Sequence, residues 1–325
     1  MKVNVAIIHG IGRSKPGYAN PLVEGISRQF AQYIRAVLKS NIDIKNELSF
    51  QEIVWDDILG ENQDKLKKIF EQEFQRRKKI AQKGAWKRFL LFLICASLFF
   101  FLFKAWCWRI AFMAIALAFS FGKKALIPLR TTFAAESVSD IIGYRNKEAY
   151  QAISGRIEKC LANFSTSQSK EPLTFISHSL GTVISSDFVY DRQKRNGELH
   201  RNLTLWNFFT LGSPLALFSL QYGPELFKSP IHLEDGRGKW INILDADDVI
   251  AYPLKQLNEE YGALVHTDMY VETGLLGVAH IHYWDNAKAH EIIGRKLALD
   301  WLAVNQKLTP EELNRRYIDF DIQTK

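Results

Sequence analysis

Residues 172–182 read Pro-Leu-Thr-Phe-Ile-Ser-His-Ser-Leu-Gly-Thr, and the interpretation of the whole chain starts from this stretch. It begins with an apolar, β-prone run over residues 173–176, and a helix-compatible segment over residues 182–191 follows it. A serine on a sharp turn between a strand and a helix is held so that its hydroxyl is available as a nucleophile. The stretch therefore predicts Ser179 as a nucleophile, and an ordinary strand-to-helix turn is the alternative.

The residues that flank this turn must be small, because strand and helix backbones come close together there. The usual pattern is Gly-x-Ser-x-Gly. Gly181 matches the second glycine, whereas Ser177 replaces the first. Serine is small enough for the position, so the replacement weakens the motif without removing the predicted nucleophile.

The positive charge of the chain is concentrated in one segment. The 325 residues are 47% hydrophobic and 24% charged, which indicates a folded chain, and carry a net charge of +7. Residues 61–88 contain ten Lys or Arg against four Asp or Glu, so the rest of the chain is nearly neutral. This basic block runs directly into a hydrophobic segment, which favours a membrane surface over nucleic acid as its partner.

The cysteine pattern predicts neither disulfides nor a metal site. Cys95, Cys107 and Cys160 have no spacing typical of pairing or of metal ligation, so reduced thiols are expected. The chain starts with a strand that the fold needs and carries no signal-peptide pattern. We therefore expect the soluble part to face the cytosol.

Strands and helices alternate along the chain. Short apolar runs predict strands at residues 3–8, 48–55, 173–176, 203–211 and 240–244, and periodic segments predict helices at residues 21–38, 147–164 and, as the last helix, 287–304. This alternation predicts an α/β fold with a mostly parallel, doubly wound sheet. The predicted catalytic domain is discontinuous, comprising residues 1–60 and 125–325, with residues 61–124 inserted after the early strands. Ligand chemistry then belongs at the carboxyl ends of the strands.

The inserted segment contains a basic helix over residues 64–83 and a hydrophobic stretch over residues 86–121. Residues 89–103 and 110–121 are almost wholly apolar, and as helices they would extend roughly 22 and 18 Å, against a bilayer core of roughly 30 Å. Because the strands on either side of the insert share one sheet, both its ends must emerge on the same side of a membrane. The sequence predicts a hairpin that either spans the bilayer or dips into one leaflet. A hydrophobic lid or a dimer contact in a soluble protein is the alternative.

Candidate partners for the serine follow it in the sequence. A serine hydroxyl needs a base, and the base needs an orienting acid. Asp245, Asp247 and Asp248 come directly after the predicted strand 240–244, while His280 and His282 precede the predicted helix 287–304. Among the acids Asp248 is favoured, and among the bases His280, with the others kept as alternatives.

Taken together, the motifs resemble the serine lipases and esterases of the α/β-hydrolase fold. The matching pieces cover most of the chain outside the hydrophobic insert, and they are His9-Gly-Ile-Gly12, Trp55-Asp56, Asp140-Ile-Ile-Gly-Tyr144, Ser177-His-Ser-Leu-Gly-Thr182, Leu211-Gly-Ser-Pro214, the loop from Asp245 to Pro253, and His280-x-x-Tyr-Trp284. As a set they are specific for a fold and a catalytic triad, but not for a substrate.

The resemblance implies a role for each part of the site. Ser179 would be the nucleophile, His280 the base and Asp248 the orienting acid. The backbone N–H groups of Ile11 and Leu180 would form the oxyanion hole. No metal or cofactor is implied.

The expected activity is hydrolysis of carboxylic esters by a membrane-associated enzyme whose catalytic domain faces the cytoplasm. An apolar hairpin would hold the site at a bilayer surface, so lipid or other acyl esters are the expected substrates. An acyltransferase or thioesterase with the same triad is one alternative. A non-catalytic membrane scaffold on a hydrolase fold is the other.

Overall fold

The computed structural model describes residues 1–12, 14–59, 72, 144, 146–164, 170–197, 199–200, 202–222, 231–233, 236–274 and 279–324. The chain divides into two compact units, one of Met1–Asp57 with Tyr150–Lys325 and the other of Ile58–Ala149. Of the predicted insert over residues 61–124, only Gln72 is described, so the predicted hairpin over residues 86–121 lies outside the described residues. Within the described ranges, no helix combines the length and the apolar character that crossing a bilayer requires.

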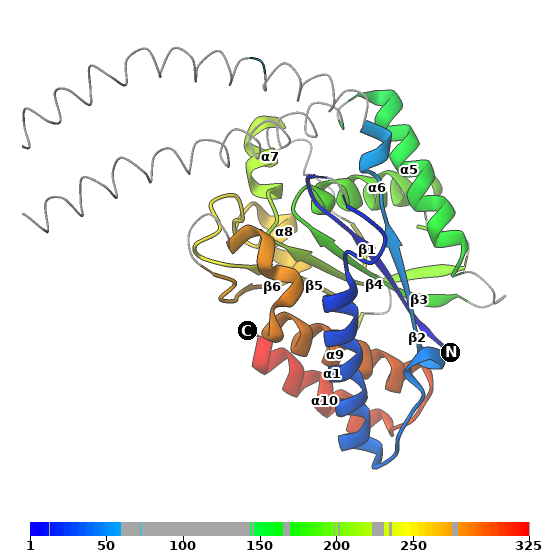
Figure 1. Cartoon of the computed structure of the whole chain (residues 1–325). Coiled ribbons are helices and arrows are strands. Elements are labelled where there is room, and N and C mark those ends of the chain that lie inside the picture. The colour runs from blue at the N-terminus through cyan, green and yellow to red at the C-terminus, as the bar shows by residue number, and fades with distance from the viewer. Residues whose placement is uncertain are drawn as a thin grey trace, which may run out of the picture. The chain divides into compact units, whose positions relative to one another are not determined.

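The larger unit is built on a sheet of six strands (Figure 1). All the strand pairs are parallel, and the order across the sheet is β2-β1-β3-β4-β5-β6. The strands are β1 (Val3–Ile8), β2 (Leu48–Ile53), β3 (Glu171–His178), β4 (Leu203–Leu211), β5 (Lys239–Leu244) and β6 (Val265–Tyr270). The predicted parallel α/β sheet is therefore confirmed.

The direction of winding reverses between β1 and β3. From β1 the chain moves outward to β2, and it later returns to β3 and continues through β4 and β5 to β6. Ile8 pairs with Ser177, so the carboxyl ends of β1 and β3 are neighbours. Ligands of parallel sheets bind at such a reversal, just beyond the strand ends.

Helices cover both faces of the sheet (Figure 1). One face carries α1 (Asn20–Leu38), α9 (Ala287–Val304) and α10 (Pro310–Thr324), whose apolar side chains form one buried cluster with β1, β4 and β5. The other face carries α5 (Lys147–Ala162) and α6 (Leu180–Asn196), where Phe188 meets Phe175 of β3 edge to face. The shorter elements are α2 (Ile44–Glu47), η1 (Asp56–Leu59), α7 (Leu215–Tyr222), α8 (Glu259–Leu264) and η3 (Ala279–Asp285).

Burial on both faces explains why the central strands were readable from the sequence. Every residue of β1 and β4 is buried, and both strands have the limits that their continuous apolar runs predict. The helix α9 also has the predicted limits. The predicted strand 48–55 ends at Ile53, and the predicted helix 182–191 extends over Leu180–Asn196.

Three substantial elements were not predicted. Strand β6 lies at the edge of the sheet, and its burial alternates, with Val265, Thr267 and Met269 inward and polar residues between them. That alternation carries less apolar signal than a central strand. The helices α7 and α10 were also missed, so residues 287–304 do not form the last helix of the chain.

Candidate active site

Ser179 lies at the junction of β3 and α6, where the sequence motif places it. Its backbone has φ 53° and ψ −129°, a strained conformation for a residue other than glycine. The strain is held by the surrounding structure, since the Ser179 N–H donates to the carbonyl oxygen of Leu211 at 3.0 Å. The backbone conformation of the turn therefore helps to set the direction of the Ser179 side chain.

The serine that replaces glycine in the motif is accommodated by a hydrogen bond. Ser177 is fully buried, and its Oγ lies 2.7 Å from Oγ of Ser185 on α6. The Ser185 hydroxyl donates to the carbonyl oxygen of Gly181 at 2.8 Å, so the Ser177 hydroxyl is the donor between the two serines. The extra polar group is satisfied, and the sharp turn forms without the first glycine.

His280 stands beside Ser179, 101 residues away in the sequence. It belongs to the short turn η3, which forms in place of the predicted loop. Its Nε2 lies 2.7 Å from Oγ of Ser179, and its Nδ1 lies 2.7 Å from Oδ2 of Asp248. A carboxylate only accepts, so Nδ1 carries the proton and Nε2 is left to accept the serine hydroxyl. This is the arrangement that turns a serine hydroxyl into a nucleophile.

Asp248 is buried behind the imidazole and accepts three hydrogen bonds. Oδ2 receives His280 Nδ1 and the Tyr283 hydroxyl, the latter at 2.9 Å, and Oδ1 receives the N–H of Ile250 at 3.1 Å. Burial by itself would raise the pKa of Asp248, but the bond to His280 and the other donors together lower it below its ordinary value. The carboxylate is thus held ionised where it can stabilise a positive charge on His280.

The other two acids do not reach His280. Asp245 accepts from the N–H of Asp247 at 2.8 Å, and from the N–H and the hydroxyl of Thr273. It therefore ties the loop after β5 to the segment after β6. Asp247 is exposed, and it supports Asp245 through its own main-chain N–H.

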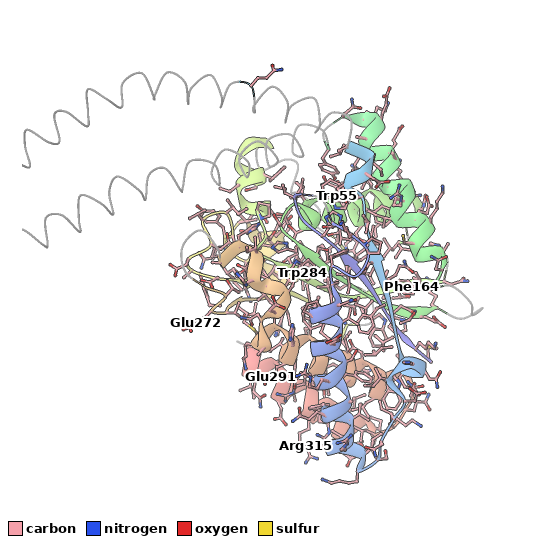
Figure 2. All side chains as sticks on the ribbon, viewed as in Figure 1. Trp55, Phe164, Glu272, Trp284, Glu291 and Arg315 are labelled. Atoms are coloured by element: carbon pink, nitrogen blue, oxygen red, sulfur yellow. The ribbon has the colours of Figure 1, made fainter. Side chains whose placement is uncertain are left out.

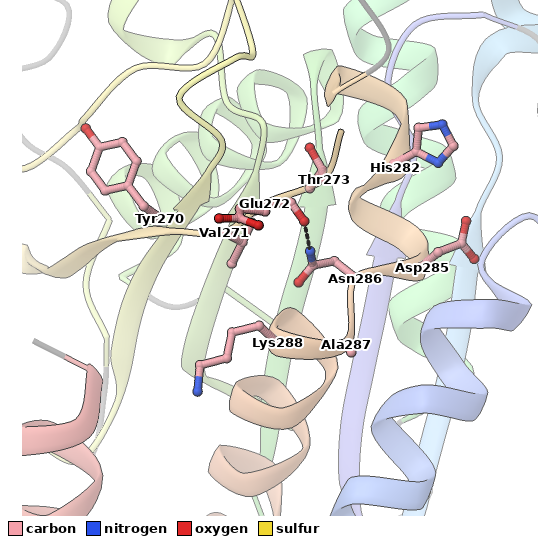
Figure 3. Close-up of a pocket in the computed structure, with 9 residues that line it drawn as sticks. All are labelled: Tyr270, Val271, Glu272, Thr273, His282, Asp285, Asn286, Ala287 and Lys288. Atoms are coloured by element: carbon pink, nitrogen blue, oxygen red, sulfur yellow. Dashed lines mark hydrogen bonds between the residues drawn. The ribbon is translucent and has the colours of Figure 1, made fainter. Parts of the chain in front are cut away.

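His282, the alternative base, faces a different part of the surface. It is exposed and lines a cavity of about 530 Å³ together with Thr273, Asp285 and Lys288 (Figure 3). In the three-residue repeat of a 3₁₀ helix, His280 lies over Tyr283 and not over His282. The conformation of η3 thus separates the two histidines, although they are only two residues apart.

The loop after β1 packs directly against Ser179. A methyl group on Gly10 would overlap Cβ of Ser179, and it would stand 3.1 Å from Oγ, so only glycine fits there. Ile11 follows at once, and Leu180 is the first residue of α6, where N–H groups have no acceptor within the helix. Of the two N–H groups predicted for the oxyanion hole, one therefore belongs to the loop that packs against Ser179 and the other to the helix that begins directly after it.

His9 supports that loop instead of reacting. Its Nδ1 donates to the carbonyl oxygen of Gly10 at 2.8 Å, and its Nε2 accepts the N–H of Trp55 at 3.3 Å. The two rings are stacked with centroids 5.1 Å apart, and Trp55 Nε1 donates to the His9 carbonyl oxygen at 3.0 Å. Trp55 is labelled in Figure 2. Both ring nitrogens of His9 are engaged inside the protein, which fits a structural role.

Tyr283 is part of the motif His280-x-x-Tyr-Trp284, but no role in the site was predicted for it. Its hydroxyl donates to Asp248 and accepts the N–H of Asp245, each at 2.9 Å. Tyr283 thus links Asp248, the favoured acid, to Asp245, one of the alternatives. The signal that could have found it is its spacing of three from His280, which is meaningful only in a 3₁₀ turn.

Neither a metal cluster nor a disulfide is found in the described part of the chain. No group of three or more His, Cys, Asp or Glu residues there is arranged to hold a metal ion. Cys160 on α5 is a free thiol, and Cys95 and Cys107 lie outside the described residues.

Comparison with known proteins adds no relative. No family of known proteins, no curated protein and no solved structure matches the chain. The chemistry of the site is therefore inferred from its own geometry.

Proposed function

We propose that the chain is a serine hydrolase of the α/β-hydrolase type that cleaves carboxylic esters through an acyl-enzyme. The observation that carries the proposal is the series of hydrogen bonds from Ser179 Oγ to His280 to Asp248, each 2.7 Å long. It is supported by the strained backbone of Ser179 at the β3–α6 junction and by the position of that junction beside the reversal of the sheet.

The first half of the reaction forms the acyl-enzyme. Ser179 Oγ attacks the ester carbonyl carbon while its proton passes to His280 Nε2. The carbonyl oxygen becomes an oxyanion, which the N–H groups of Ile11 and Leu180 would stabilise. When the tetrahedral intermediate collapses, the bond to the alcohol oxygen breaks, and His280 gives its proton to the departing alcohol.

Water completes the cycle. It attacks the acyl carbon and passes a proton to His280, and the second collapse returns that proton to Ser179 and releases the carboxylic acid. Asp248 keeps the Nδ1–H tautomer in place throughout and stabilises the imidazolium of each half-reaction. Every proton that moves in the two half-reactions therefore passes through His280, between Ser179 and the alcohol or between water and Ser179.

Lipid or other acyl esters are the proposed substrate class. The basic block over residues 61–88 and the hydrophobic stretch over residues 86–121 favour association with a membrane, with the catalytic domain on the cytoplasmic side. Apolar surface beside the site supports the same choice. Val249 and Ile281, which directly follow Asp248 and His280 in the sequence, have 63% and 54% of their surface exposed.

A fluorophosphonate probe tests the proposal, because it labels only an activated serine. Wild-type protein should be labelled, and Ser179→Ala should not. Ser219→Ala is the matched control, since the partly buried Ser219 hydroxyl donates to the carbonyl oxygen of Ala216 within its own helix α7, and this variant should still be labelled. An unlabelled wild type, or equal labelling of the Ser179→Ala variant, would overturn the proposal.

Activity on a panel of acyl esters with varied chain length and head group, with and without liposomes, then tests the substrate class. Longer chains and added liposomes should raise kcat/KM. Added acceptor alcohols distinguish hydrolysis from acyl transfer, because a transferase would form a new ester in place of the free acid.

A further inference from the structure

His178 joins the nucleophile strand to the main chain of the proposed base. It is the last residue of β3, directly before Ser179, and its side chain is buried. Its Nε2 lies 2.7 Å from the main-chain oxygen of His280. A carbonyl oxygen only accepts hydrogen bonds, so Nε2 of His178 carries a proton and donates it.

The ring of His178 is a neutral donor and not a second base. Burial, and then the nearby His280 ring, lowers the pKa of His178 to about 3. Among the described residues, the rings of Tyr283 and Trp284 also lie close to it, with centroids at 5.7 and 5.3 Å. The negative charge of Asp248 acts in the opposite sense and raises the pKa of His178, whereas a positive charge on His9 would lower it further.

Neutrality at this place matters for the proposed chemistry. The His178 and His280 rings have centroids 4.9 Å apart. A positive charge on His178 would oppose the imidazolium that His280 forms each time it takes a proton. An uncharged ring can hold His280 without that repulsion.

The turn that carries His280 is held by side chains from outside it. The Thr273 hydroxyl lies 2.7 Å from both Oδ2 of Asp245 and the carbonyl oxygen of Ala279 and shares its one proton between them, which ties the start of η3 to the segment after β6. His178 donates to the next carbonyl, that of His280, and ties the same turn to β3. The second contact connects the turn to the strand that ends at Ser179.

Proton transfer depends steeply on this connection. Misplacing a catalytic group by about 1 Å can lower a rate about 100-fold. Because His178 and Ser179 are consecutive in the chain, any shift of the nucleophile strand moves the donor that holds His280 along with it.

We infer that His178 is a positioning residue, which sets the reach of His280 Nε2 to Ser179 Oγ by donating its own Nε2–H to the main chain of His280. The inference rests on the proposed hydrolase function, in that it explains how that site keeps its geometry.

Two substitutions that differ by one methylene group test it. In His178→Gln the amide nitrogen of the new side chain would take the place of Nε2, whereas the shorter amide in His178→Asn reaches only as far as Nδ1. We expect His178→Asn to lower kcat about 10- to 100-fold with KM little changed. His178→Gln should keep most of the wild-type kcat.

The matched control is His266, a partly buried histidine of β6 whose Nε2 lies 3.1 Å from the hydroxyl of Thr324. This contact involves neither η3 nor Ser179, His280 or Asp248. His266→Asn and His266→Gln should both keep wild-type kcat. Equal kcat for wild type and folded His178→Asn, or equal loss in His178→Asn and His178→Gln, would overturn the inference.

A measurement on the wild-type protein covers the case in which the Asn variant does not fold. In protein labelled with ¹⁵N-histidine, His178 should give the signals of the neutral Nε2–H tautomer at every pH between about 5 and 9, well above its lowered pKa. The Nδ1–H tautomer, or a titration of His178 within that range, would overturn the inference. This readout does not require turnover, so it separates a failure of the positioning role from a failure of the hydrolase proposal, which the probe labelling of Ser179 reports.

Discussion

The hydroxyl of Tyr283 donates to Oδ2 of Asp248 at 2.9 Å, the same oxygen that accepts the proton-bearing nitrogen of His280. The phenol also accepts the main-chain N–H of Asp245. One side chain thus fixes the proposed triad acid and satisfies a buried donor of the neighbouring loop.

Replacing Tyr283 with Phe should therefore affect both activity and stability. The loss of a donor to Asp248 frees its carboxylate to turn, so we expect kcat to fall about 10-fold. The buried N–H of Asp245 loses its acceptor, which should cost about 1–3 kcal/mol of unfolding free energy. Steady-state kinetics and urea unfolding measure the two effects. The control is Tyr252→Phe, because the Tyr252 hydroxyl bonds to the main-chain oxygen of the exposed Val249. Unchanged kcat in Tyr283→Phe would contradict the role of the Tyr283 hydroxyl.

The choice of Asp248 as the triad acid predicts unequal effects of the three neighbouring carboxylates. Asp248→Asn should lower kcat about 10⁴-fold, because an amide no longer holds the Nδ1–H tautomer of His280. Asp245→Asn and Asp247→Asn leave that contact intact, so their kcat should stay within about 10-fold of wild type. A larger loss in Asp245→Asn than in Asp248→Asn would reverse the assignment.

Replacement of the two candidate bases, His280 and His282, should also have clearly different effects on kcat. Removal of a general base lowers kcat about 10²–10⁴-fold, and we expect this for His280→Ala. His282 is exposed and lines the separate cavity, so His282→Ala should turn over esters at the wild-type rate. Probe labelling of Ser179 provides an independent check, since it should be lost in the first variant and kept in the second.

Gly10 is predicted to be irreplaceable because of its contact with Ser179. A methyl group there would overlap the serine Cβ, so Gly10→Ala must displace either the nucleophile or the loop that carries Ile11. We expect loss of probe labelling even where the protein stays folded by circular dichroism. Gly155→Ala is the control, since no atom of the described residues lies within 4 Å of a methyl group added there, and alanine inside helix α5 should stabilise the protein by about 0.5–1 kcal/mol. Labelling of Gly10→Ala at the wild-type level would refute the contact.

Asp245 should make stability depend on pH in the acidic range. Burial alone would raise its pKa, but hydrogen bonds from Asp247 and Thr273 lower it below the ordinary value of about 4. A depressed pKa in the folded state adds stability above about pH 4, which is lost as the pH falls through the folded-state value. Asp245→Asn should therefore be less stable than wild type at pH 7, by about 1–3 kcal/mol, and the difference should shrink toward pH 3.

Urea unfolding of both proteins at about pH 7, 5 and 3 measures this difference. Asp247→Asn serves as the control because Asp247 is exposed and contributes its main-chain N–H to Asp245. A difference that stays constant across this pH range would mean that the carboxylate of Asp245 is not the source of the stability.

The central elements were predictable because their signals are local. The strands β1 and β4 are mostly apolar, since both faces of each are buried, and helix α1 carries a clear helical period, with Leu22, Ile26, Phe30 and Ile34 on its buried side. Strand β6 was not predicted because only every second residue of this edge strand is buried, so its sequence contains no continuous apolar run. Its place beside β5 is a property of the sheet and leaves little trace in its own six residues.

For the site, local sequence was enough to locate the turn at Ser179, since a strand, small residues and a helix follow one another within the chain. It also narrowed the partners to three acids and two histidines. Asp248 and His280 were already favoured among these candidates, but their contacts with each other and with Ser179 exist only in the folded chain, because they depend on how the ends of β3 and β5 and the turn η3 meet in space. The contacts of Tyr283 and His178 likewise exist only in the folded chain. Their contacts join residues 35 and 102 positions apart, and no periodicity of a single segment encodes a distance between two others.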